Sequence, residues 1–258
     1  MSFRFLTPFW LLVIAPNLSG AGVDASAAFD AANKLYEQGQ YGQAAVAYQG
    51  LTQTGTTSAT VYFNLGNAWF KAGQTGRAIA AWRLGESLAP RDPSIRFNLN
   101  FARKRVSGTD GQLVPAWQRA LCSLTLNEWC ALASVALWLW FGLLSCRELR
   151  PLLRRALQGY TATAGILVLL LAACVAGAAN LQFNTVSAVV IVPEAIVRSG
   201  PLDEAKVLHQ FRDGVEVTSL DTKELTGDGQ KQTWHQVRDS LKRTGWVKSD
   251  QLAIIPPR

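Results

Sequence analysis

The sequence predicts a multidomain chain that combines all-α helical hairpins, two transmembrane helices and a C-terminal all-β barrel. Three observations predict this organisation: an internal repeat near the N-terminus, two uncharged apolar runs in the middle, and short β-branched segments separated by turns near the C-terminus. The composition agrees, because 49% of the 258 residues are hydrophobic, only 17% are charged and the mean hydropathy is +0.10. Such a balance is typical of soluble domains joined to membrane segments.

Residues 1–25 have the pattern of a signal peptide. A short basic start precedes an apolar run over residues 5–16, and small or polar residues follow up to Ala25. We expect cleavage after Ala21 or Ala25, where small residues occupy the positions that a signal peptidase reads. The alternative is an uncleaved N-terminal anchor, for which the apolar run is short, since a full span needs about 20 residues.

An internal repeat occupies residues 25–92. Three residues of its first copy recur 34 positions later without a gap, and a fourth position keeps an aromatic ring; the pairs are Asn33/Asn67, Gly39/Gly73, Ala44/Ala78 and Tyr48/Trp82. This is the period of tetratricopeptide repeats, which stack helical hairpins. The copy at 59–92 carries nearly the whole pattern, whereas the copy at 25–58 has Ala31-Ala32 in place of Leu65-Gly66. Residues 93–106 begin a third copy and stop, so we expect a capping helix that completes a domain over 26–106.

Analogy with this repeat places a set of amide and aromatic side chains on the concave face of the helical array. Asparagine offers a donor and an acceptor to an extended backbone, and aromatic rings offer apolar contact, so the set suits peptide binding. The alternative is that the asparagines only brace helix packing. A carboxylate clamp is not expected, because Phe29 and Ser94 stand where its basic residues would be. The candidate groove residues are Phe29, Asn33, Tyr36, Asn64, Asn67, Phe70, Asn98 and Phe101.

The middle of the chain predicts a membrane anchor. Residues 113–125 suggest a short interfacial helix, and two apolar stretches at 127–146 and 161–181 are long enough to span a bilayer. The loop at 147–160 holds four arginines against Glu148 alone, so the positive-inside rule predicts that it is cytoplasmic. Both soluble domains are then expected outside the cytoplasm. Buried helices of a soluble protein are the alternative for either stretch alone.

The segment at 186–257 predicts a small all-β domain. Turn signals separate six candidate strands at 195–198, 207–211, 215–220, 234–238, 246–248 and 253–255. The order of these segments resembles bacterial SH3-like domains of cell envelopes. The tyrosine cluster with which the eukaryotic relatives bind proline-rich helices is missing, so this resemblance does not imply a polyproline ligand.

Several function classes find no support in the sequence. We find no catalytic constellation, no phosphate-binding loop and no spacing typical of a metal or cofactor site around His209, His235 or the four cysteines. On one continuous helix Cys122 and Cys130 would be about 12 Å apart, too far for a disulfide, so we expect them unpaired. The net charge of +7 does not indicate nucleic-acid binding, because residues 182–258 hold ten basic and ten acidic side chains and the excess lies beside the membrane segments.

The order of these parts resembles the BatE-type proteins of bacterial aerotolerance (Bat) operons. The phrase Phe63-Asn64-Leu65-Gly66-Asn67-Ala68 and the cap at 95–106, just ahead of the spans, carry the resemblance. It implies a scaffold in an envelope stress or maturation complex at a bacterial inner membrane. Because the sequence shows no catalytic constellation and no cofactor site, we also expect no enzymatic activity and no cofactor. The partners that the resemblance implies are membrane proteins with von Willebrand factor A domains, a further Bat protein and a MoxR-type ATPase. The alternative function is a membrane anchor that binds peptidoglycan through the SH3-like domain.

Overall fold

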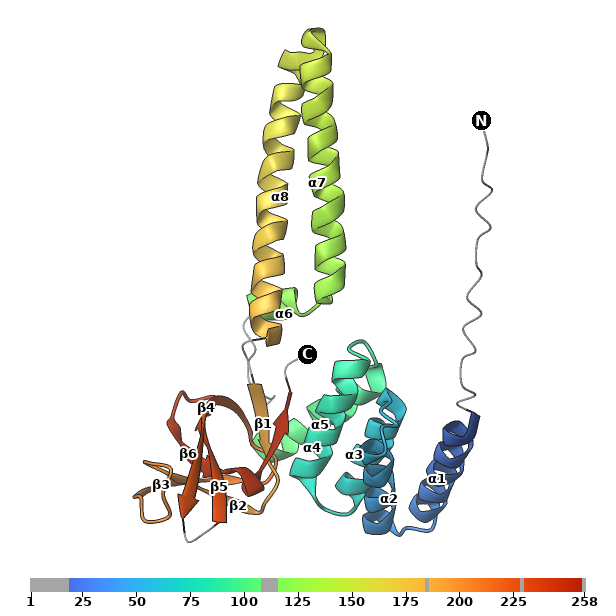
Figure 1. Cartoon of the computed structure of the whole chain (residues 1–258), viewed down its shortest axis with the longest axis vertical. Helices are drawn as coiled ribbons and strands as arrows, with labels where there is room; N and C mark the ends of the chain where they lie inside the picture. Colours follow the sequence, from blue (N-terminus) through green and yellow to red (C-terminus); the bar gives the residue numbers. More distant parts are fainter. Residues whose placement is uncertain (1–18, 108–115, 184–185, 228–229, 257–258) are drawn as a thin grey trace, which may run out of the picture.

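A computed structural model describes residues 19–107, 116–183, 186–227 and 230–256. Figure 1 shows an array of helices, α1–α5, beside a β-sheet, and both lie at the same end of two long helices, α7 and α8. Most of the predicted signal peptide, the start of the predicted interfacial helix at 113–115 and residue 257 fall outside the described residues. The described chain thus has the predicted helical, apolar and β parts in the predicted order.

The helical array consists of two antiparallel hairpins and a fifth helix. Gly39 and Gly73 end the first helix of each hairpin with positive φ angles of 77° and 80°, a conformation that glycine adopts without a steric penalty. They occupy equivalent positions of the two copies, so the sequence repeat is also a repeat of the turn. The helices are α1 (Ser19–Glu37), α2 (Tyr41–Gln53), α3 (Ala59–Lys71), α4 (Thr75–Leu88) and α5 (Pro93–Ser107).

The two hairpins differ at one packing contact between two positions, and the difference explains why the first copy of the repeat departs from the pattern. A Cβ atom on Gly66 would overlap the indole of Trp82, which fills the space between α3 and α4 and donates to the carbonyl of Phe63. In the first hairpin the smaller Tyr48 stands in place of Trp82, and the fully buried Ala32 stands in place of Gly66. A smaller ring therefore permits the extra methyl group.

Two long apolar helices follow the array: α7 (Leu126–Leu149) and α8 (Arg154–Phe183). At 1.5 Å per residue they measure about 36 and 45 Å, so each is long and apolar enough to cross about 30 Å of hydrocarbon. They pack together through Trp140, whose Nε1 donates to the carbonyl of Thr161 at 3.0 Å and whose ring lies against Gly165. A short turn, η1 (Pro151–Leu153), joins them within the basic loop.

The predicted interfacial helix ends earlier in the structure than in the sequence analysis, at Leu121 and not at Thr125. Its described part is α6 (Ala116–Leu121), and the chain turns before Thr125, which caps α7 through a reciprocal pair of hydrogen bonds with Glu128. Cys122 and Cys130 therefore do not share one helix, and both carry free thiols. Leu121 packs against Gly177, which fixes α6 across the base of α8.

The C-terminal part forms an antiparallel sheet of seven strands. The strand order is β3-β2-β6-β5-β4-β1-β7. Each of the six expected strands is present. Strands β4 and β5 are longer than expected and pair as one hairpin up to Gly227 and Gln230. The sequence analysis missed β1, which pairs with both β4 and β7. The strands are β1 (Val186–Val190), β2 (Glu194–Arg198), β3 (Val207–Arg212), β4 (Glu216–Gly227), β5 (Gln230–Arg238), β6 (Thr244–Lys248) and β7 (Leu252–Ile255).

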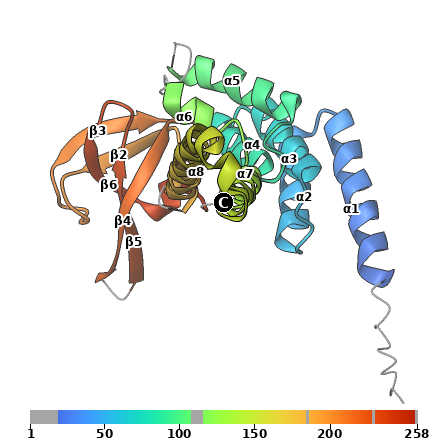
Figure 2. The same cartoon turned by 90° about the horizontal axis from the view of Figure 1, so that it is seen from above.

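The sheet and the helical array share a hydrophobic core. Val189 of β1 and Ile255 of β7 are buried in the same cluster as the array's own core residues, and both strands contact α4. Helix α4 contacts α5 as well as β1 and β7, and Figure 2 shows α5 and the β domain on different sides of the array. The predicted capping role of residues 93–106 is therefore divided between α5 and the β domain.

Candidate functional site

The first helices of the hairpins and α5 line a groove with two hollows. The larger hollow, of about 260 Å³, lies among residues of α1, α3, α4 and α5, and the smaller, of about 140 Å³, among residues of α1, α2 and α3. Tyr36 and Asn67 line both, so the two hollows are adjacent. Seven of the eight groove residues expected from the sequence line one hollow or both: Asn33, Tyr36, Asn64, Asn67, Phe70, Asn98 and Phe101.

The asparagines of the groove connect neighbouring helices. Asn98 of α5 donates to the side-chain oxygen of Asn67 of α3 at 2.8 Å, and Tyr48 donates to the side-chain oxygen of Asn33 at 2.6 Å. Asn64 approaches the same oxygen of Asn33 at 3.5 Å. These contacts agree with the bracing role left open above. They also leave Asn67 Nδ2 and Asn98 Oδ1 without a hydrogen-bond partner among the described residues, so both atoms are available to a ligand backbone.

Aromatic rings form the walls of the larger hollow. Phe70 contacts the buried Trp82 with ring centroids 5.7 Å apart and contacts Phe101 edge to face at 5.9 Å. The guanidinium of Arg105 lies over Phe70, 5.7 Å from the ring centroid. Phe29, the remaining expected groove residue, lines neither hollow and packs edge to face on Tyr48 at 5.8 Å. Its position at the start of the array makes it part of the helix packing.

The structure adds groove residues that the sequence analysis missed. Phe97 and Lys71 line the larger hollow, and Glu37 lines the smaller one. Phe97 could have been found from the repeat, because it is the counterpart of Phe63 in the truncated third copy. Phe63 is half-buried, but Phe97 is 70% exposed because the array ends at α5 and no further hairpin covers it. A residue that packs inside the array thus has a counterpart that lines an open hollow.

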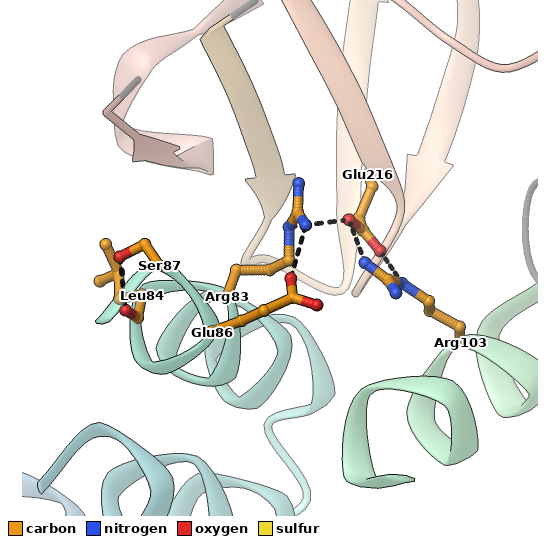
Figure 3. A network of polar contacts seen from close by, with 6 residues as sticks. All are labelled: Arg83, Leu84, Glu86, Ser87, Arg103 and Glu216. Atoms are coloured by element: carbon orange, nitrogen blue, oxygen red, sulfur yellow. Dashed lines mark hydrogen bonds and ion pairs between the residues drawn. The ribbon is translucent and has the colours of Figure 1, made fainter. Parts of the chain in front are cut away.

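A second polar cluster lies where the helical array meets the β domain. The carboxylate of Glu216 accepts two hydrogen bonds from Arg103 of α5, at 2.5 and 3.0 Å, and lies 3.4 Å from Nε of Arg83 of α4 (Figure 3). Burial by itself raises the pKa of Glu216, but the hydrogen bonds and charge of Arg103 and the charge of Arg83 outweigh it and hold the pKa below its usual value. Glu216 is therefore ionised at neutral pH and bridges two helices.

Asp213 makes a parallel contact with the first turn of α4. Both of its carboxylate oxygens accept from the backbone N–H of Gly76 at 3.0 Å, which suits the positive end of a helix dipole. Burial raises the pKa of Asp213, although this N–H group and the charge of Arg77 favour the ionised form. A Cβ atom on Gly76 would overlap both Asp213 and the carbonyl oxygen of Val190. At the equivalent position of α2, Gly42 faces open space.

The arginines at 91–105 contribute to the excess of positive charge beside the membrane segments, and they have several separate roles. Arg91 forms an ion pair of 2.7 Å with Glu128 in the first turn of α7, so it connects the helical array to the apolar helices. Arg103 binds Glu216, and Arg105 lies over the groove residue Phe70. Arg91 and Arg103 therefore serve internal contacts between parts of the chain.

The two histidines lie within the β domain. His235 is buried, and its Nδ1 lies 3.0 Å from the hydroxyl of Thr222 and 3.5 Å from that of Ser219. His209 packs edge to face on Phe211 at 4.9 Å. Burial lowers the pKa of both imidazoles, and the charge of Arg243 adds to this effect at His209. Within the described ranges, no group of three or more His, Cys, Asp or Glu side chains is placed to hold a metal ion.

In comparisons with known proteins, no protein-family model matches the chain, and no curated protein matches it.

Proposed function

We propose that this chain is a membrane-anchored, extracytoplasmic scaffold that binds an extended segment of a protein partner in the groove of its helical array. One observation carries the proposal: α1, α3 and α5 line a groove whose two adjacent hollows both contain aromatic rings and side-chain amides. Aromatic rings offer apolar anchoring, and the amides pair with an extended backbone. In this proposal the chain has no catalytic activity and needs no cofactor.

The helical array is assigned to the tetratricopeptide type within this proposal. Support comes from the two hairpins, whose turn glycines occupy equivalent positions of the repeat, and from the exchange of Gly66 and Trp82 for Ala32 and Tyr48 at matching positions. The C-terminal sheet is assigned to the SH3-like type. Support comes from its small size, its antiparallel pairing throughout and the sequence order of its strands.

Placement in a bacterial inner membrane, with both soluble domains outside the cytoplasm, is part of the same proposal. Support comes from two adjacent helices of spanning length and from the arginines at and beside the turn that joins them. An even number of crossings returns the chain to the side from which it started, which agrees with a helical array and a β domain that share one core. The short α6, with Trp117 exposed, suits the interface beside the first span.

The partners belong to the proposal through the BatE resemblance alone. They are membrane proteins with von Willebrand factor A domains and other Bat-operon products, acting together in an envelope stress or aerotolerance complex. The groove must then hold a segment that such a partner exposes outside the membrane.

Site-specific photo-crosslinking tests the proposal. Benzoylphenylalanine replaces Phe97, which is 70% exposed and lines the larger hollow, in the full chain expressed in membranes together with the candidate partner. Val46 of α2, 63% exposed and outside both hollows, is the matched control position. We expect an adduct with a distinct partner from position 97, its loss in the Phe101→Ala background, and no such adduct from position 46. Equal adducts from both positions, or none from position 97, would contradict groove binding.

A further inference from the structure

The charges along the groove are unevenly distributed. Helices α3 and α5 together contain five basic residues and no acidic residue. Lys71 lines the larger hollow, and Arg105 lies over one of its walls. At the other end, Glu37 lines the smaller hollow. The groove therefore has a basic, aromatic end toward α5 and an acidic, amide-rich end toward α1.

Lys71 and Arg105 differ from Arg91 and Arg103 because neither forms an ion pair among the described residues, although Arg105 lies over the ring of Phe70. Arg103 is held by Glu216, and Arg91 by Glu128. Lys71 and Arg105 are exposed, and neither forms an ion pair with any of the described residues. Both charges are thus available to a ligand that reaches the larger hollow.

The size and lining of the larger hollow indicate what enters it. Its volume of about 260 Å³ lies below the range of roughly 300–1,000 Å³ that is typical of small-molecule sites, and aromatic rings form most of its lining. One apolar side chain of a peptide fits such a space, with the rest of the peptide outside. The open amide atoms Asn67 Nδ2 and Asn98 Oδ1 lie on the same lining and suit the peptide backbone beside that side chain.

We infer that the groove selects an acidic segment, in which an apolar side chain enters the larger hollow and neighbouring Asp or Glu side chains pair with Lys71 and Arg105. This inference rests on the proposed function, because the groove must first bind a peptide. The pairing uses side-chain carboxylates and does not need the C-terminal carboxylate of the ligand, consistent with Phe29 and Ser94 at the positions of a carboxylate clamp. The ligand lies with its acidic end toward α5.

A selection experiment with matched variants tests the inference. The full chain in nanodiscs of neutral phosphatidylcholine is exposed to a phage-displayed library of random short peptides. Enriched peptides are then synthesised with a fluorophore, and binding is followed by anisotropy at low and high salt. The test variant is Lys71→Glu/Arg105→Glu. The control variant, Lys206→Glu/Arg212→Glu, changes the net charge equally on exposed residues of the β domain. Phe101→Ala reports whether a peptide occupies the groove, and thermal unfolding confirms that each variant is folded.

The expected result is enrichment of peptides with an apolar residue beside Asp or Glu. Their affinity should fall about tenfold or more in Lys71→Glu/Arg105→Glu, should fall with salt in the unaltered chain, and should be unchanged in the control variant. Peptides that depend on Phe101 but show no acidic preference, and bind the charge-reversed variant equally well, would overturn this inference and leave groove binding intact. Failure to enrich any peptide that depends on Phe101 would overturn both the inference and the proposed function.

Discussion

Replacement of Glu216 by glutamine should weaken the junction between the helical array and the β domain. The change preserves the shape of the side chain but removes its charge, and it leaves Arg103 and Arg83 facing a neutral amide. Because Glu216 starts β4 and its two partners lie on α5 and α4, the effect should appear on both sides of the junction. Glu224→Gln, at an exposed position of the same strand, is the matched control.

The structure sets the size of the effect. Removing one partner of a fully buried ion pair costs about 3–5 kcal/mol. The side chains of Glu216, Arg103 and Arg83 are 20%, 25% and 27% exposed, so water reaches the arginines in part and a cost of about 2–3 kcal/mol is expected. For a protein of this size, each 1 kcal/mol lowers the melting temperature by about 2–4 °C, which gives a fall of about 4–12 °C.

The assay uses the full chain in detergent micelles. Thermal unfolding is followed by tryptophan fluorescence, to which the buried Trp82 in the array and the buried Trp234 and Trp246 in the sheet contribute. Hydrogen exchange measured by mass spectrometry should show faster exchange in both α4 and β4 of Glu216→Gln. A double-mutant cycle with Arg103→Met isolates the pair, and we expect a coupling energy of about 1–3 kcal/mol.

The reasoning fails if the free energies of unfolding of Glu216→Gln and Glu224→Gln differ by less than about 0.5 kcal/mol, the range of ordinary surface substitutions. A coupling energy near zero between Glu216 and Arg103 would lead to the same conclusion. Faster exchange in β4 alone would show that the β domain does not stabilise the array.

Four further predictions concern other parts of the chain. Gly76→Ala should lower the melting temperature because the added methyl group clashes with Val190 and Asp213. Gly42→Ala, at the equivalent and open position of α2, should stabilise the helix by about 0.5–1 kcal/mol. The two variants must therefore shift the melting temperature in opposite directions, and shifts in the same direction would contradict the prediction. Because burial lowers the pKa of His209 and His235, the unfolded state binds more protons, so stability should fall as pH decreases from about 7.5 to about 6.0, and less so in His209→Gln/His235→Gln; equal slopes of melting temperature against pH would contradict this. Alkaline phosphatase fused after Val106 or Arg258 should be active and a fusion within residues 147–160 inactive; activity of the last fusion would overturn the topology. Asn64→Ala/Asn67→Ala should weaken binding of a groove-selected peptide by about one to two orders of magnitude in anisotropy measurements, with the chain still folded; unchanged affinity would show that the asparagines only brace the helices.

The sequence alone determined the parts of this protein whose signal is local. The turn glycines and the Asn and aromatic positions recur at a fixed spacing, and the two apolar stretches are uninterrupted. The hairpins and the long helices could therefore be predicted with nearly correct positions. Seven of the eight expected groove residues line the hollows for the same reason, since the repeat fixes which helix face they occupy. Strand β1 was missed because it directly follows the apolar α8 and has three successive buried residues in place of an alternating pattern.

Only the tertiary structure decided how the parts meet. Glu216 and Arg103 are 113 residues apart, and Asp213 and Gly76 are 137 residues apart, so neither contact leaves a pattern in the sequence. The exposure of Phe97 also depends on the place where the array ends, although its sequence position repeats that of the half-buried Phe63. Periodicity specifies which face of an element is buried, but contacts between distant segments depend on packing that forms when the whole chain folds.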